Sequence, residues 1–415
     1  MPDFYERQDC RLCRGRNLVR VITLAPTPPG NQFLTSEEAQ HEEQTFPLYV
    51  MLCQDCTHLQ LGVVVDPKIL FQRDYKYVSG TSPVFVNHFR NYAKWVAETQ
   101  GIEAGGLVVD VGSNDGTALH CFKDLGHRVL GIDPATEIAN EATANGIPTV
   151  AAFFDSTLAR RLRGEHGPAA FITSHNVCAH VDDLEDLMRG VELLLADDGV
   201  FIFEVGYAVD VYDNAWFDTI YHEHLDFHTV RPFVAFFERL GMVVVDVHRI
   251  DVQGGSIRVV VRKKAFGDPR VHDRVRACLD AESRRKFSDP ETFRRFASRI
   301  DGIGGQLRSL LAGLKEQDRS IAAYGAPTKS TTLLTHFKIT RDEIRYIVDD
   351  NPKKQGRFSP LIHIPVVGPD VLRDDPPDYL LILAWNFAPA IMAKCKAFAE
   401  GGGKFVLPMP EAKIV

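Results

Sequence analysis

A buried-strand pattern followed at once by a glycine turn and a helix constrains the fold of this chain most strongly. Leu107 to Val111 is an apolar run, Gly112 and Gly116 bound the turn, and a helical pattern begins at Thr117. Further strand candidates alternate with helical segments: 128–132, 169–174, 199–205 and 242–248. Alternation at this spacing predicts an α/β fold with a doubly wound sheet and right-handed crossovers.

A second α/β set follows a change in composition near residue 270. Val271 to Leu314 is charged and amphipathic, which predicts one or two long helices. Four strand candidates come after it: 320–324, 346–348, 379–383 and 404–407. The pattern therefore predicts two Rossmann-like domains separated by a helical linker.

The four N-terminal cysteines form two Cys-x-x-Cys pairs, Cys10/Cys13 and Cys53/Cys56. Two such knuckles can place four thiolates in a tetrahedron, which is typical of a closed structural zinc site. The alternative is that one pair is redox-active. His58 lies just behind Cys56 and could act as a ligand, but we expect it to be a surface histidine.

The turn after the first strand predicts a cofactor site. Asp133 ends the second strand, 21 positions after Gly112, where an acid can bind ribose hydroxyls. Both dinucleotides and S-adenosylmethionine use this architecture. Here Asn114 stands where a dinucleotide fold needs glycine, and Asp110 suits a cationic ligand. We therefore favour S-adenosylmethionine over NAD.

Two other segments carry candidate site residues. The segment after residue 174 lies at the carboxyl edge of the predicted sheet, so Asn176 and His180 could face the cofactor or the substrate; a solvent-facing His180 is the alternative. Tyr75 and Tyr77 lie on a connector that could form an aromatic lid or simply pack.

The segment Tyr221-His222-Glu223-His224 gathers proton-handling groups. Histidines at i and i+2 do not fit a helical zinc motif. Imidazole can accept a proton near neutral pH, and a phenol can hydrogen-bond a developing enolate oxygen. Carbon methylation needs a carbanion, whereas oxygen and nitrogen already carry lone pairs. This set therefore favours C-methylation, with a structural hydrogen-bond cluster as the alternative.

Bulk properties exclude several classes. The formal net charge of −8 and a pI near 6.0 argue against non-specific binding to nucleic acid or to an anionic membrane. The start of the chain shows no secretory signal, and no apolar run approaches the roughly 20 residues needed to span a bilayer. We expect a cytoplasmic protein.

Taken in order, these motifs resemble the sugar C-methyltransferase family of antibiotic deoxysugar pathways. The resemblance also uses Gly254-Gly255-Ser256 and the segment from Ala323 to Lys329, and it covers nearly the whole chain. It implies three domains: a zinc-binding domain (1–70), an S-adenosylmethionine-binding methyltransferase domain with the aromatic lid segment (71–265), and a helical linker with a C-terminal Rossmann-like substrate domain (266–415). It also implies a monomer.

The resemblance implies a dTDP-linked 4-keto-6-deoxyhexose as substrate, often with a 3-amino group or a 2-deoxy carbon. The C-3' proton is removed and the enolate carbon attacks the sulfonium methyl group. His224 would be the base, Glu223 and Tyr221 would orient the sugar, and Tyr75 would close over it. Cys178 and the Phe227-His228 pair depart from the family pattern and leave the substrate's identity open.

The remaining binding residues are assigned by position. Cofactor contacts are expected from Asp110, Gly112, Asn114, Gly116, Asp133, Asn176 and His180. Substrate contacts are expected from Tyr77, His180, Gly325, Thr328, Lys329 and Asn386. The last four lie where a strand passes into a helix or a loop, a position that commonly binds phosphate. The alternative is a glycine turn that serves packing alone.

Three rival functions remain. An NAD-dependent nucleotide-sugar epimerase or dehydrogenase would normally show G-x-x-G-x-x-G and Tyr-x-x-x-Lys, and neither is in place. A zinc-ribbon module that binds nucleic acid would need a basic face. An O- or N-methyltransferase on the same sugars can be separated from C-methylation only by its activity.

Overall fold

The computed structural model describes residues 3–71, 83–251, 254–265 and 270–415. Within them the central domain has a seven-stranded sheet in the order β12-β13-β10-β9-β6-β7-β8. The strands are β6 (Leu107–Val111), β7 (Arg128–Asp133), β8 (Thr149–Ala151), β9 (Ala169–His175), β10 (Leu195–Gly206), β12 (Met242–Ile250) and β13 (Ser256–Lys263). The helices of this region are α2 (Pro83–Gln100), α3 (Thr117–Asp124), α4 (Thr136–Ala144), α5 (Ser156–His166), α6 (Leu184–Leu194), α7 (Ala208–Asn214) and α8 (Val230–Arg239).

The sheet follows from the apolar runs. All five residues of β6 are buried, as expected for a parallel strand covered on both faces. The predicted alternation is confirmed, but β13 was not anticipated. It runs antiparallel between β10 and β12 and begins directly after Gly254-Gly255.

The N-terminal region has its own four-stranded sheet, in the order β11-β4-β3-β2. Three strands come from this region, β2 (Leu18–Thr27), β3 (Phe46–Cys53) and β4 (Leu59–Leu61), and β1 (Phe4–Glu6) pairs with β5 (Val63–Val65). The fourth strand, β11 (Asp226–Phe227), comes from the central domain and pairs with β4. The chain just after Tyr221–His224 is thus hydrogen-bonded into the N-terminal sheet.

The C-terminal domain has a six-stranded sheet in the order β16-β15-β14-β17-β18-β19. Its strands are β14 (Ile321–Tyr324), β15 (Ile347–Val348), β16 (Val366–Val367), β17 (Tyr379–Ile382), β18 (Lys404–Leu407) and β19 (Lys413–Ile414). Its helices are α11 (Lys329–His336), α12 (Val371–Asp374), α13 (Ala388–Lys394) and α14 (Lys396–Glu400). The three-part α/β architecture expected from the sequence is confirmed.

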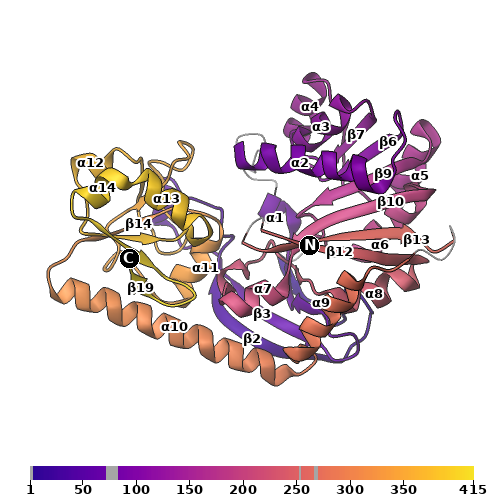
Figure 1. The fold of residues 1–415 in the computed structure, drawn as a ribbon. Coiled ribbons are helices and arrows are strands. Elements are labelled where there is room, and N and C mark those ends of the chain that lie inside the picture. Colours follow the sequence, from indigo (N-terminus) through magenta and orange to yellow (C-terminus); the bar gives the residue numbers. More distant parts are fainter. Residues whose placement is uncertain (1–2, 72–82, 252–253, 266–269) are drawn as a thin grey trace.

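The predicted linker consists of two helices, α9 (Asp273–Arg284) and α10 (Pro290–Glu316). In Figure 1, α10 runs below the molecule from the central domain to the C-terminal domain, and it packs against β2 on the way. Asp289 caps its first turn by accepting a hydrogen bond from the backbone N–H of Glu291. The N-terminal sheet therefore lies between the two larger domains.

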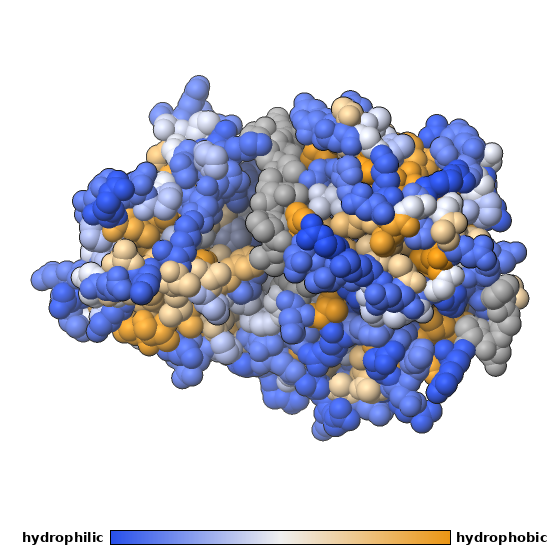
Figure 2. Space-filling model, turned by 45° about the horizontal axis from the view of Figure 1, so that its top comes forward, coloured by the Kyte–Doolittle hydropathy of each residue, from blue (hydrophilic) through white to orange (hydrophobic). Residues whose placement is uncertain are grey.

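The face of the molecule in Figure 2 is mostly hydrophilic, with small apolar patches. None of the helices that the structure describes is long and apolar enough to cross a bilayer.

Candidate active site

The central feature of the site is the hydrogen bonding of His224. Its Nδ1 lies 2.7 Å from the carbonyl oxygen of Thr219, and its Nε2 lies 2.8 Å from the hydroxyl of Tyr221. A carbonyl can only accept, so Nδ1 carries the proton and Nε2 accepts from the tyrosine hydroxyl. Burial lowers the pKa of His224 to about 4, although the bond to Thr219 raises it. His224 is therefore a neutral imidazole whose basic nitrogen faces a phenol.

Glu223 and His180 flank this pair. Burial raises the pKa of Glu223 to about 7, and the charge of Lys354 opposes that rise. The ring of His180 lies edge-on to that of His224, with centroids 5.0 Å apart, and burial beside His224 lowers the pKa of His180 to about 3. The Nδ1 atom of His180 is buried and its ring packs against His224, so the side chain does not point into solvent. The side chains of Tyr221, His224 and His180 thus lie together, and the buried carboxyl group of Glu223 faces the charge of Lys354.

His222 has different contacts. It is buried, its Nε2 donates to the carbonyl of Pro47 at 3.2 Å, and its ring packs edge-on against Phe46. It therefore ties the segment to the N-terminal region.

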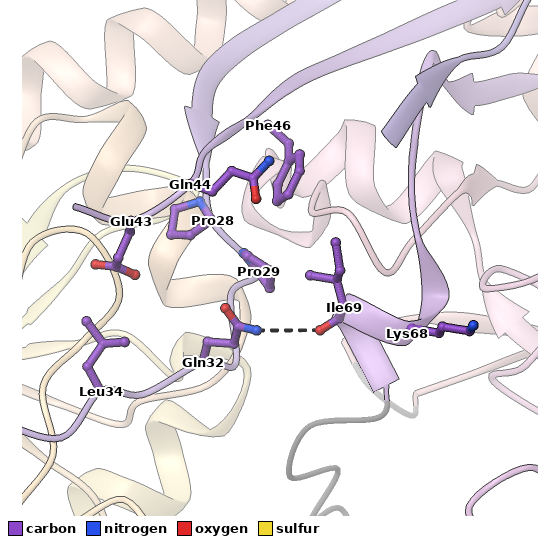
Figure 3. A pocket seen from close by; sticks show the side chains of 9 residues that line it. All are labelled: Pro28, Pro29, Gln32, Leu34, Glu43, Gln44, Phe46, Lys68 and Ile69. Atoms are coloured by element: carbon purple, nitrogen blue, oxygen red, sulfur yellow. Dashed lines mark hydrogen bonds between the residues drawn. The ribbon is translucent and has the colours of Figure 1, made fainter. Parts of the chain in front are cut away.

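Phe46 also lines a pocket of about 630 Å³ in the N-terminal region (Figure 3). Gln32 reaches across it to the carbonyl of Ile69 in α1 (Pro67–Phe71). The lining residues are Pro28, Pro29, Gln32, Leu34, Glu43, Gln44, Phe46, Lys68 and Ile69. None of the predicted site residues that the structure describes lines it.

The predicted cofactor residues gather at the carboxyl edge of the central sheet. The backbone N–H of Asn114 donates to Asp133 at 2.9 Å, and Gly112 and Gly116 both have φ of +78°. A Cβ on Gly112 would stand 2.2 Å from a methyl of Val177. Asn176, with φ of +58°, leaves the end of β9 beside them. Glycine thus lets the turn pack closely against Val177, and a hydrogen bond ties the turn to the acid that ends β7.

Asp110, at the end of β6, is a second acid at this edge. Its side chain is buried, burial raises its pKa to about 7, and its Oδ1 has no hydrogen-bond partner among the described residues. Such an orphaned buried carboxylate oxygen fits a cationic group of a ligand. The residues of this edge therefore fit S-adenosylmethionine, whose amino and sulfonium groups are positive.

A buried charge network next to Asp110 was missed by the sequence analysis. Glu204 accepts from His88 Nε2 at 2.8 Å, from His175 Nδ1 at 3.2 Å, and from Arg258 Nε at 2.8 Å. The two histidines and the glutamate could in principle hold a metal ion. Because the guanidinium already neutralises the carboxylate, we interpret the group as an ion-pair network joining α2 to the sheet. The only feature of the sequence that pointed to this network was His175 at the end of β9.

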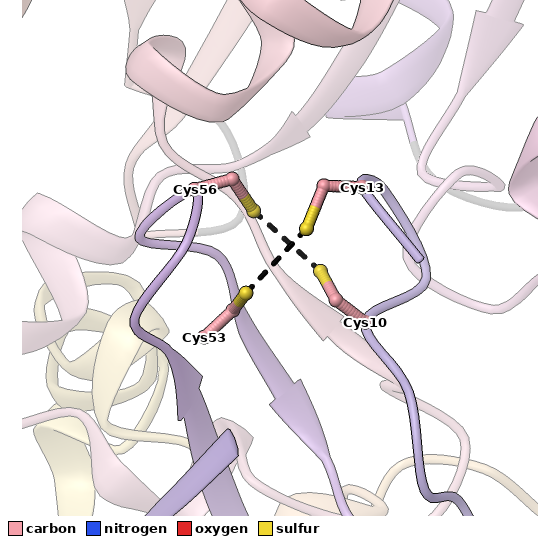
Figure 4. Close-up of side chains that lie close together, drawn as sticks. All are labelled: Cys10, Cys13, Cys53 and Cys56. Atoms are coloured by element: carbon pink, nitrogen blue, oxygen red, sulfur yellow. Dashed lines mark hydrogen bonds between the residues drawn. The ribbon is translucent and has the colours of Figure 1, made fainter. Parts of the chain in front are cut away.

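The four N-terminal cysteines converge from two loops (Figure 4). Their sulfur atoms lie within 4.8 Å of one another, and the Cys10–Cys56 and Cys13–Cys53 pairs are each 3.5 Å apart. Zinc–thiolate bonds of about 2.3 Å in a tetrahedron would place sulfurs roughly 3.8 Å apart. The donor set therefore fits a structural zinc ion, with all four positions filled by protein.

His58 is not the surface histidine expected from the sequence. It is fully buried, its Nε2 donates to Asp226 at 2.7 Å, and its ring stacks on His228. The pairing of β11 with β4 brings Asp226 to it, which no local pattern could reveal. His58 thus helps to fix the strand that follows His224.

The C-terminal candidates lie where the strands β14 and β17 end. Gly325 has φ of +89°, and Thr328 precedes α11. Lys329 donates to Asn386 at 2.8 Å, and its ammonium lies 3.5 Å from the ring centroid of Trp385. These residues are brought together, but the lysine is engaged with protein groups. Tyr75 and Tyr77 lie outside the described residues.

Comparison with known proteins decides the family. The chain is 36% identical over 407 residues to the C-methyltransferase NovU of Streptomyces niveus, which covers 98% of this chain and 96% of that protein. The chain belongs to the C-methyltransferase family. Three family models match this C-methyltransferase: "Putative zinc binding domain" at 10–71, "Methyltransferase domain" at 86–247 and "C-methyltransferase C-terminal domain" at 251–410. It is an S-adenosylmethionine-dependent enzyme with a zinc-binding domain.

Several solved methyltransferase structures resemble part of this chain. One is a complex between the Trm112 methyltransferase activator and a methyltransferase from Haloferax volcanii. The match has 17% sequence identity and a TM-score of 0.37, and it covers 44% of this chain and 94% of that chain. Another is magnesium protoporphyrin IX methyltransferase from Synechocystis PCC 6803. The match has 12% sequence identity and a TM-score of 0.34, and it covers 43% of this chain and 79% of that chain.

Proposed function

We propose that this C-methyltransferase methylates C-3' of a dTDP-linked 4-keto-6-deoxyhexose, with His224 as the base that generates the enolate. The observation that carries the proposal is the 2.7 Å contact between Nδ1 of His224 and the carbonyl oxygen of Thr219. The Thr219 carbonyl holds the proton on Nδ1 and leaves Nε2 basic. The similarity to NovU and the family resemblance support a nucleotide sugar of the deoxysugar and antibiotic pathways as the substrate.

The proposed chemistry follows from the acidity of the sugar. A ketone at C-4' acidifies the C-3' proton, and a neutral imidazole can remove it. Since Tyr221 donates to Nε2 in the structure, its hydroxyl must turn from His224 toward the sugar as the proton leaves. There it can hydrogen-bond the developing enolate oxygen, as can the protonated form of Glu223.

S-adenosylmethionine supplies the electrophilic methyl group that the enolate carbon takes. Asp133 is proposed to accept from its ribose hydroxyls and Asp110 to face its positive end. The turn Gly112-x-Asn114-x-Gly116 gives it room, with Asn176 and His180 at the neighbouring strand end. Two of the acceptor sites of Asp133 are used by the backbone N–H groups of Asn114 and Ala135, which orients its carboxylate.

The substrate contacts proposed for the C-terminal domain are Gly325, Thr328, Lys329 and Asn386, with Tyr75 and Tyr77 from the connector. A phosphate at Lys329 would have to replace its bond to Asn386. We further propose a cytoplasmic, monomeric enzyme, in line with the family resemblance.

The test uses S-adenosylmethionine labelled with ¹³C in its methyl group and a panel of dTDP-4-keto-6-deoxyhexoses with and without a 3-amino group. NMR of the product should show the labelled methyl bonded to C-3'. A label on oxygen or nitrogen would instead make the protein an O- or N-methyltransferase.

His224→Asn should abolish this transfer, whereas the matched variant His222→Asn should retain it because His222 faces Pro47. If His224→Asn kept as much methyl-transfer activity as His222→Asn, His224 would not be the base.

A further inference from the structure

Two side chains of the C-terminal domain form hydrogen bonds to the residues before and after Thr219. Trp385 Nε1 donates to the carboxylate of Asp218 at 2.7 Å. The hydroxyl of Thr332 donates to the carbonyl of Ile220 at 3.0 Å. Asp218 belongs to the short 3₁₀ turn η3 (Phe217–Thr219), and Ile220 directly follows it. The Thr219 carbonyl that accepts from His224 therefore lies between two residues fixed by another domain.

The Trp385 side chain is buried and closely packed. The Trp385 ring stacks on Trp216, with centroids 4.8 Å apart, while Lys329 lies 3.5 Å from its centroid. Asp218 is fully buried, and a Cβ on Gly254 would stand 3.3 Å from Trp216 and 3.5 Å from Trp385. Because these neighbours pack against the indole ring of Trp385, its N–H stays directed at the carboxylate of Asp218.

The charge of the buried lysine also acts on this carboxylate. Burial raises the pKa of Asp218 to about 6, while Lys329 and the Trp385 bond lower it. Burial lowers the pKa of Lys329 to about 8, opposed by Asp218. Lys329, over the face of the Trp385 ring, and Asp218, at its indole nitrogen, thus stabilise each other's charged form.

We propose that Trp385 is a positioning residue for His224, acting through Asp218 and the carbonyl of Thr219. This inference rests on the proposed role of His224 as the base. If the turn shifts, Nδ1 loses its acceptor and the proton can move to Nε2. The histidine then presents an N–H, not a lone pair, toward Tyr221. The C-terminal domain would thus contribute to catalysis itself as well as to substrate binding.

The test separates the hydrogen bond from the packing. Trp385→Phe keeps an aromatic ring against Trp216 and Lys329 but removes the N–H donor. Asp218→Ala removes the acceptor, whereas Asp218→Asn keeps an oxygen that can accept from Trp385. Trp216→Phe is the matched control, because it alters the other ring of the stack and leaves the bond to Asp218 in place.

Two readouts are needed: kcat and KM for methyl transfer, and ¹⁵N NMR of histidine-labelled protein, with His224 assigned by its loss in His224→Asn. We expect Trp385→Phe and Asp218→Ala to lower kcat about 10- to 100-fold with little change in KM, since misplaced catalytic groups cost rates of this order. Their His224 signals should show loss of the Nδ1–H tautomer. Asp218→Asn and Trp216→Phe should stay within about threefold of wild type.

A Trp385→Phe enzyme with unchanged kcat and an unchanged His224 tautomer would overturn the inference. If Asp218→Ala fails to fold, Trp385→Phe still decides the matter. If wild-type protein turns over no sugar of the panel, the proposed function fails, while the tautomer measurement still tests the positioning role.

Discussion

At the residue scale, the pKa values of His224 and Glu223 predict the pH dependence of catalysis. His224, with its pKa lowered to about 4, is in its basic form at every pH above that value. Glu223, with its pKa raised to about 7, loses its donor proton as the pH rises through 7. The plot of kcat/KM against pH should therefore fall near 4 on the acid side and near 7 on the alkaline side.

The matched variant for the alkaline limb is Glu223→Gln, which keeps a donor at every pH. Its rate should stay flat above pH 7 while that of the wild type falls. An alkaline limb that persists in this variant would show that Glu223 does not act as a proton donor.

The residue pattern predicted candidates for the acid–base site but not the contacts of the neighbouring histidines. Tyr221 and His224 are hydrogen-bonded to each other, and the ring of His180 packs against that of His224. The sequence could not show that His222 turns to Pro47 or that His58 is buried against Asp226. Both facts depend on contacts between residues about 170 positions apart, which carry no local period.

At the element scale, the turn between β6 and α3 is predicted to depend on Gly112. Alanine there would adopt φ of +78° and place its Cβ 2.2 Å from Val177. The left-handed conformation alone costs about 1–2 kcal/mol for a residue with a side chain. We expect Gly112→Ala to lower the thermal midpoint and to weaken binding of S-adenosylhomocysteine at least tenfold, measured by calorimetry.

The control is Gly164→Ala, within α5, where an added Cβ meets no atom within 4 Å. Alanine in a helix interior should be neutral or stabilising by about 0.5–1 kcal/mol. Similar affinity losses in both variants would mean that the Gly112 turn has no special part in the cofactor site.

Strongly apolar runs between turn signals were predictable even where the strand is short, as at β15, whereas strands in the loop-rich or glycine-rich segments were missed. The five predicted strands of the central domain and the two linker helices are present because their apolar periodicity is strong. The two-residue strand β11 has no periodicity to detect, yet it joins the segment after His224 to β4. β13 was missed because its glycine-rich approach resembles a loop.

At the scale of the whole molecule, the zinc site is predicted to support the active site through β11. The cysteine loops adjoin β3 and β4, and β4 pairs with β11, which begins two residues after His224. Since metal binding by such sites is coupled to folding, Cys53→Ser should lose the bound zinc and lower the thermal midpoint. Activity should fall in parallel.

Cys121→Ser is the control, because Cys121 lies in α3, outside the cysteine cluster. Elemental analysis and calorimetry of both variants would make the comparison. Cys53→Ser protein with a full zinc content and an unchanged midpoint would contradict a structural zinc at this site.

The central claim is that His224 creates a carbanion at C-3' beside a ketone. The most direct measurement is exchange of the C-3' proton of a dTDP-4-keto-6-deoxyhexose with solvent deuterium, followed by NMR in the presence of S-adenosylhomocysteine. The account predicts exchange with the wild-type enzyme and none with His224→Asn. Methyl transfer to carbon by wild type, combined with equal exchange in His224→Asn, would contradict it.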